Sequence, residues 1–197
     1  MSDCIEKTEG KGFSESREAG GAEKPYTLPS WRVSEIILIA VKFLSDQGYW
    51  DDSFDYQKAV IGEGIVIKAY SAFKRENLAE LQKVSLSLWD EGLCLIATDK
   101  ETGKVCRMIA YNDDRTAAEI MQIIFHEFAH IKFGHTEQSQ HGEAEAILFS
   151  AITVFLMIAE QQFHIGRLIA RDGGAKHLYE GMRAGLMDKF GGQKEVI

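Results

Sequence analysis

Three residues in the middle of the chain have the types and the spacing of a metal-dependent hydrolytic site. They are His126, Glu127 and His130, which form a His-Glu-x-x-His motif. Residues four positions apart on a helix lie on the same face one turn apart, so the two imidazoles can bind one zinc ion. Glu127 lies on a neighbouring face, where its carboxylate can accept a proton from water and deliver it to a leaving amine. The motif predicts a zinc hydrolase with Glu127 as its general base.

A catalytic zinc ion needs a third protein ligand and an open position for water. Two acidic residues after the motif are candidates, Glu143 and Glu145. Glu143 is preferred because it starts the following apolar segment, where an antiparallel return past the motif could bring its carboxylate to the metal. Glu145 is the alternative. Residues two apart on a helix point in very different directions, so we expect one of the two to bind and not both.

His135 is the next histidine along the chain, and its spacing bears on the type of site. It follows His130 by five residues, whereas metzincins place a third histidine six residues after the second. This spacing argues against a metzincin site. We expect His135 to be a polar residue at the end of the motif helix, favourably placed against the helix dipole.

Two helices are predicted to position these residues. Thr116 and Glu119 fit a capping box, which marks the start of a helix that runs to Gly134 and carries the motif. Residues 142–162 form an almost entirely apolar helix that should be the most deeply buried element and should present the third ligand. Further helices are expected over residues 31–44 and 69–83.

Three segments before the motif have the patterns of strands. They are residues 84–89, which alternate apolar and polar side chains, and residues 93–98 and 105–111. Because they follow one another closely, we expect a small antiparallel sheet in the form of a meander. Packed on the helical core that carries the motif, this sheet makes an α+β fold.

Composition predicts one globular domain preceded by a tail. Residues 1–24 have few large apolar side chains and are expected to be disordered, while residues 25–197 are long enough to form a single domain. Residues 166–190 are expected to add a last helix. The chain has 30 acidic and 22 basic residues and no Lys/Arg block, which argues against direct binding of nucleic acid.

The N-terminal residues and the longest apolar run bear on location. The first residues lack the basic start and apolar middle of a signal peptide, which predicts a cytoplasmic protein. The uncharged run 146–159 is too short to span a bilayer and is flanked by Glu145 and Glu160, so we expect a core helix and no membrane association. The three cysteines form no CxxC pair, which suits a reducing compartment.

Three segments resemble the ImmA/IrrE family of metallopeptidases, whose domain is also called DUF955. They are residues 109–112 (IAYN), 124–135 (IFHEFAHIKFGH) and 143–151 (EAEAILFSA). The last is similar to the family pattern E-x-E-A-N-x-F-A-A, with Ile147 in place of the usual Asn. The common Leu-Leu-Met-Pro ending is replaced by Ile-Thr-Val-Phe at residues 152–155. The resemblance covers roughly the middle half of the chain.

The resemblance implies a zincin-like fold in which the first glutamate of that pattern, Glu143, completes the zinc site. It also implies a zinc-dependent endopeptidase that cleaves a helix-turn-helix repressor in phage, mobile-element or stress-response regulation. In zincins an edge strand beside the motif helix holds the substrate extended, and residues 105–111 are the candidate. The alternatives are a zinc-fold module that binds without cleaving and a metal-sensing regulator. An intact Glu127 favours the enzyme, because a structural zinc needs no base.

Overall fold

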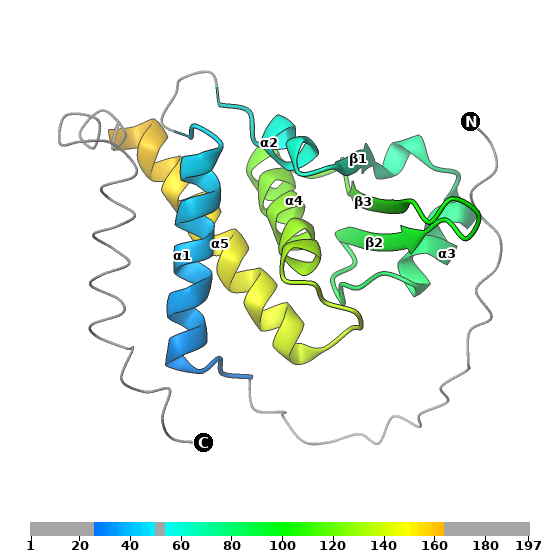
Figure 1. Cartoon of the computed structure of the whole chain (residues 1–197). Helices are drawn as coiled ribbons and strands as arrows, with labels where there is room; N and C mark the ends of the chain where they lie inside the picture. Colours follow the sequence, from blue (N-terminus) through cyan, green and yellow to red (C-terminus); the bar gives the residue numbers. More distant parts are fainter. Residues whose placement is uncertain (1–25, 50–53, 164–197) are drawn as a thin grey trace, which may run out of the picture.

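The computed structural model describes residues 26–49 and 54–163 and shows the expected α+β architecture (Figure 1). The predicted tail at residues 1–24 and the predicted helix at residues 166–190 lie outside the described residues. The elements, in chain order, are α1 (Ser30–Asp46), α2 (Tyr56–Gly62), β1 (Ile65–Ala69), a 3-10 turn η1 (Tyr70–Ala72), α3 (Arg75–Lys83), β2 (Gly92–Thr98), β3 (Val105–Tyr111), α4 (Ala117–Lys132) and α5 (Gln140–Phe163).

The sheet is mixed, and this corrects the predicted antiparallel meander. Its strand order is β1-β3-β2, with β2 antiparallel and β1 parallel to β3. Ile65 aligns with Arg107 in the parallel pair, and Gly92 aligns with Tyr111 in the antiparallel pair. β3 is therefore the central strand, and the prediction that residues 105–111 form the edge strand is wrong. The two edge strands are β1 and β2, and β2 is the edge strand that lies against the motif helix.

Residues 84–89 do not form the third strand that their alternation predicts. Their buried side chains are the serines, since Ser85 and Ser87 are 6% and 4% exposed, whereas Leu88 is 52% exposed. Ser85 Oγ accepts a hydrogen bond from the Ser87 amide, and Ser87 Oγ accepts one from the Trp89 amide. Such local side-chain bonds compete with a strand ladder, and they fold this segment into turns.

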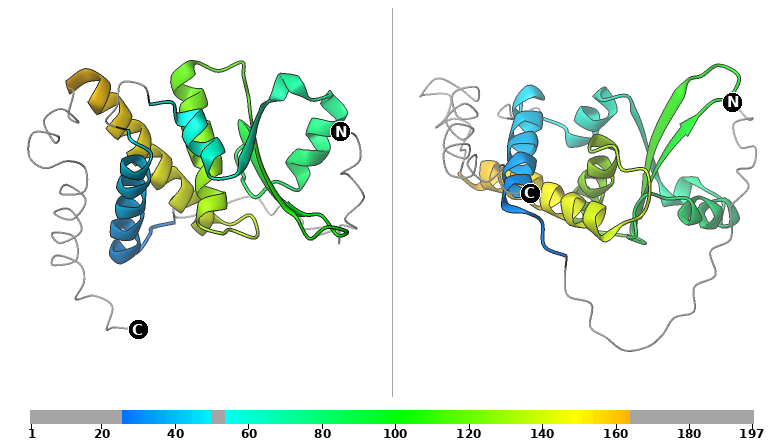
Figure 2. Two further views of the ribbon diagram at one scale, coloured as in Figure 1. Left: turned by 45° about the horizontal axis from the view of Figure 1, so that its top comes forward. Right: turned by 60° about the horizontal axis from the view of Figure 1, so that its bottom comes forward.

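The motif helix α4 begins at the predicted capping box. Thr116 Oγ1 accepts a hydrogen bond from the Glu119 amide, and the Glu119 carboxylate accepts one from the Thr116 amide. The helix ends after Lys132, and Gly134 then adopts a φ of 70°, which a glycine tolerates without strain. α4 contacts β2 and β3 on one side and α5 on the other, so it lies between the sheet and α5 (Figure 2).

The long helix α5 packs against α4 and α1, but the prediction that it is the most deeply buried element is wrong, because the unbroken buried run at residues 123–130 belongs to α4. Phe149 and Ala146 are fully buried, and Phe149 contacts Phe43 and Phe128. The opposite face exposes Ile147 and Phe155.

By length and composition alone, residues 140–161 of α5 could cross a membrane, and 44% of the apolar window is buried inside the described fold. Core helices of soluble proteins meet the same criterion.

Candidate metal centre

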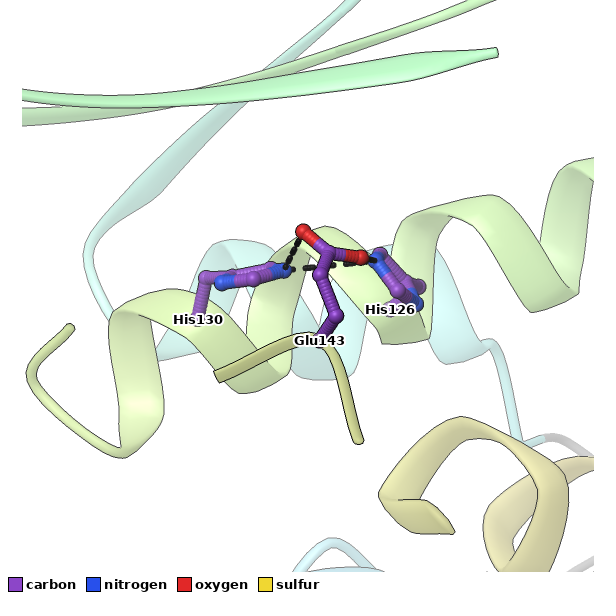
Figure 3. A group of neighbouring side chains, drawn as sticks. All are labelled: His126, His130 and Glu143. Carbon is purple, nitrogen blue, oxygen red and sulfur yellow. Dashed lines mark hydrogen bonds and ion pairs between the residues drawn. The ribbon is translucent and has the colours of Figure 1, made fainter. Parts of the chain in front are cut away.

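His126, His130 and Glu143 meet at the boundary between α4 and α5 (Figure 3). The two imidazoles project from one face of α4, and their Nε2 atoms are 3.2 Å apart. The Glu143 carboxylate reaches them from the first turn of α5, with Oε2 3.2 Å from His126 Nε2 and Oε1 3.4 Å from His130 Nε2. The three ligand atoms lie within 4.8 Å of one another, so one ion could contact all three.

The connection between the helices places Glu143 at this point. Gly134 reverses the chain after α4, and the Glu143 amide donates to the Ser139 carbonyl as α5 begins. Gly142 precedes the glutamate, and a Cβ there would lie 3.1 Å from His135 Nδ1 and 3.1 Å from Ser139 Oγ. A larger residue would crowd this turn, and the close approach therefore favours glycine.

The electrostatics of the triad suit a divalent cation. Burial and the neighbouring His126 lower the pKa of His130, so its imidazole is neutral and keeps a lone pair. Burial opposes ionisation of Glu143, but its hydrogen bonds with His126 and the Leu88 amide outweigh burial and lower its pKa. Imidazole nitrogens with one carboxylate oxygen are the donor set of many catalytic zinc sites. The residues present therefore fit a zinc ion.

Glu127 lies beside the triad in a closed environment. It is 0% exposed, and neither carboxylate oxygen forms a well-aligned hydrogen bond with another described residue, although Cys94 and Ser87 are its polar neighbours. Burial raises the pKa of Glu127 to about 8. Gly92 provides the space, because a Cβ at that position would lie 2.6 Å from Glu127 Oε1. The role of Gly92 was not predicted from the sequence.

Glu145 does not join the triad but bonds two residues around it, His135 and Arg32. His135 Nδ1 lies 2.9 Å from His130 Nδ1, and His135 Nε2 lies 2.9 Å from Glu145 Oε2. Arg32 of α1 donates two hydrogen bonds to the Glu145 carboxylate, which is 2% exposed. Burial opposes its ionisation, but the Arg32 and His135 bonds lower the pKa of Glu145 to about 2. His135 thus lies just past the end of α4, as predicted, and it also contacts a candidate ligand, which was not predicted.

Residues 85–89, here called the cover segment, close the site on the side of the sheet. The Leu88 amide donates a 2.7 Å hydrogen bond to Glu143 Oε1, and Ser87 Oγ lies 3.5 Å from His126 Nε2. The Trp89 ring packs on His126 with 4.6 Å between ring centroids. His126 is consequently only 1% exposed. No sequence pattern indicated these contacts, because they join segments that are far apart along the chain.

Comparisons of the chain with protein-family models, with curated proteins and with solved structures gave no match.

Proposed function

We propose that the chain is a zinc-dependent endopeptidase in which His126, His130 and Glu143 hold the metal. The observation that carries this proposal is the buried Glu127 carboxylate beside the triad, which lacks well-aligned hydrogen bonds with the described residues. A structural zinc site is normally closed by four protein ligands and needs no such group. When bound, zinc would lower the pKa of a water molecule and polarise the scissile carbonyl.

The side chains would divide the chemical tasks. The Glu127 carboxylate would accept a proton from the attacking water and deliver it to the leaving amine. Gly92 would keep free the space that this carboxylate occupies. His135 and Glu145 would orient His130, because a ligand imidazole commonly uses its second nitrogen to bond an outer partner.

The substrate we propose is a helix-turn-helix repressor, cleaved in the cytoplasm. This proposal, a zincin-like fold and membership of the ImmA/IrrE family all rest on the resemblance of the motif and of residues 143–151. The formal net charge of -8 is complementary to a basic DNA-binding partner and would favour their encounter.

A second candidate function is a metal-binding module or metal sensor that acts by protein contact without cleavage. The closed site favours it, since Glu127 and His130 are both 0% exposed. The two functions differ in one respect that can be measured. Only the peptidase requires the carboxylate of Glu127. A binding module requires only the folded surface and the bound metal.

The test compares the wild-type protein with Glu127→Gln. Both should contain about one zinc ion per chain by elemental analysis, because the substitution leaves the three ligands in place. Both are incubated with a candidate helix-turn-helix repressor, and intact repressor is followed by mass spectrometry. We expect cleavage to fall by a factor of about a hundred to ten thousand in Glu127→Gln, since the amide cannot accept the proton.

Glu137→Gln is the matched control, because Glu137 lies exposed in the connection between α4 and α5 and outside the triad. It should retain wild-type cleavage and wild-type zinc. If wild type and Glu127→Gln both bind the repressor and relieve its DNA binding without any cut, the peptidase proposal fails and the binding module replaces it.

A further inference from the structure

The edge of β2 nearest the metal centre is already paired with the chain's own backbone. The Cys94 carbonyl accepts a 3.1 Å hydrogen bond from the Leu86 amide, and the Cys94 amide donates a 3.3 Å bond to Ser85 Oγ. β2 is an edge strand of the described sheet, and the free groups of an edge strand pair readily with an extended peptide. At Cys94 the cover segment takes the place that such a peptide would use.

The same segment continues from this edge to the triad. Two residues after Leu86, the Leu88 amide donates to Glu143 Oε1, the carboxylate oxygen nearer His130. Ser87 and Trp89 lie against His126. One short stretch of chain thus blocks both the strand edge and the open side of the candidate metal centre, as a bound peptide would.

The cover segment is held in part by hydrogen bonds from the exposed side chain of Gln138, which water can replace. Gln138 Nε2 donates to the Ser85 carbonyl at 3.0 Å and to the Ser87 carbonyl at 3.1 Å. Leu86 packs against the core, whereas Leu88 is 52% exposed. A pocket of about 240 Å³ lies along the segment and is lined in part by Gln82 and Gln138. Hydrogen bonds from an exposed side chain and adjacent open space are features of segments that open locally at low cost.

We infer that the cover segment is an internal occupant of the peptide-binding site, and that an extended polypeptide binds along β2 only after residues 85–89 leave. The inference rests on the proposed function. Gln138 acts as the latch, since it lies in the connection between α4 and α5 and joins that connection to two carbonyls of the segment.

The first experiment measures access to the metal, which does not require cleavage. Zinc-loaded wild type, Gln138→Ala and the control Glu137→Ala are mixed with excess chromogenic chelator, and the rate of zinc release is recorded. Loss of two hydrogen bonds should raise the open population, and the release rate with it, by roughly ten- to thirtyfold in Gln138→Ala. Glu137→Ala should match wild type. Equal rates in all three proteins would overturn the inference.

The second experiment tests whether the segment is displaced by a peptide. Hydrogen exchange of zinc-loaded protein is measured with and without a peptidyl hydroxamate, a zinc-binding peptide analogue. We expect residues 85–89 to exchange faster in the complex while the Cys94 amide stays protected, because a backbone carbonyl of the peptide replaces Ser85 Oγ as its acceptor. Failure of the hydroxamate to bind even Gln138→Ala, or binding with the segment still protected, would refute the inference.

These outcomes are separable from failure of the proposed function. One outcome is that zinc release is faster in Gln138→Ala and the segment is displaced, while neither wild type nor Glu127→Gln cleaves the repressor. In that case the peptidase proposal fails, and the cover segment is the gate of a binding site. Cleavage that depends on Glu127 but is indifferent to Gln138 would leave a peptidase without this gate.

Discussion

At the scale of residues, two glutamates separated by one alanine have different tasks. Glu143 points to the Nε2 atoms of the two motif histidines, and Glu145 points to His135 and Arg32. The hydrogen-bond partners are consistent with one assignment of protons. His130 Nδ1–H donates to His135 Nδ1, and His135 Nε2–H donates to Glu145, which leaves His130 Nε2 free to bind a metal.

This chain of contacts predicts a graded loss of metal affinity. Glu143→Ala should reduce zinc affinity most, because it removes a ligand. His135→Ala and Glu145→Ala should still bind zinc, but their zinc affinity should be about 10- to 100-fold lower. This is the usual effect of losing an outer partner of a ligand. Competition titration against a chelator of known affinity measures each constant.

His141→Ala is the control, because His141 contacts Glu145 from the exposed side and does not touch His130. It should leave zinc affinity unchanged. A larger loss in Glu145→Ala than in Glu143→Ala would reverse the two roles. Wild-type affinity in His135→Ala would show that its contact with His130 has no energetic consequence.

At the scale of elements, α4 carries three of the four proposed functional residues, and its start is defined by a local capping box. α5 carries the fourth in its first turn. The connection between them contributes a positive-φ glycine, Gly134, and a crowded glycine, Gly142. The triad therefore depends on the pairing of two helices rather than on a loop.

Thr116→Ala should lower the free energy of unfolding by about 1 kcal/mol, since it leaves an amide of the first turn of α4 without its hydroxyl partner. Urea denaturation of the metal-free protein measures the change. Zinc affinity should stay at the wild-type value, because the cap lies roughly three turns from His126. Thr116→Ser retains the oxygen and should recover most of the stability. A large loss of zinc affinity would mean that the cap also positions the ligands.

At the scale of the whole molecule, the candidate metal centre lies where three structural layers meet. α4 and α5 supply the ligands, the cover segment reaches them from the sheet, and Arg32 connects α1 through Glu145. A metal at this point would join parts of the chain that are distant in sequence. Its binding should consequently stabilise the fold as a unit.

Removal of zinc should lower the melting temperature. A ligand present at a thousand times its dissociation constant stabilises the folded state by about 4 kcal/mol, which corresponds to roughly 10 °C for a chain of this size. Differential scanning calorimetry with and without chelator measures the shift, and added zinc should reverse it. Glu143→Ala should melt at the same temperature in both conditions. An equal chelator effect in that variant would place the metal elsewhere.

The sequence by itself determined the features that depend on neighbours along the chain. The spacing of His126 and His130, the cap at Thr116 and the apolar helix after Gly142 follow from helical periodicity, and all are present in the structure. Glu143 could be favoured over Glu145 because a return past the motif brings the start of α5 to the imidazoles. A fold of α+β class followed from the mixture of helical and strand patterns.

Only the tertiary structure decided the features that depend on pairing between distant segments. Local alternation does not say which strand is central, so β3 was expected at an edge and β1 was not expected to pair with it. The same alternation predicted a strand at residues 84–89, where buried serine hydroxyls bond nearby amides instead. Arg32 and Glu145 are 113 residues apart, and the Leu88 amide and Glu143 are 55 apart. No periodicity spans such separations, and these contacts form only when the helices and the sheet pack together.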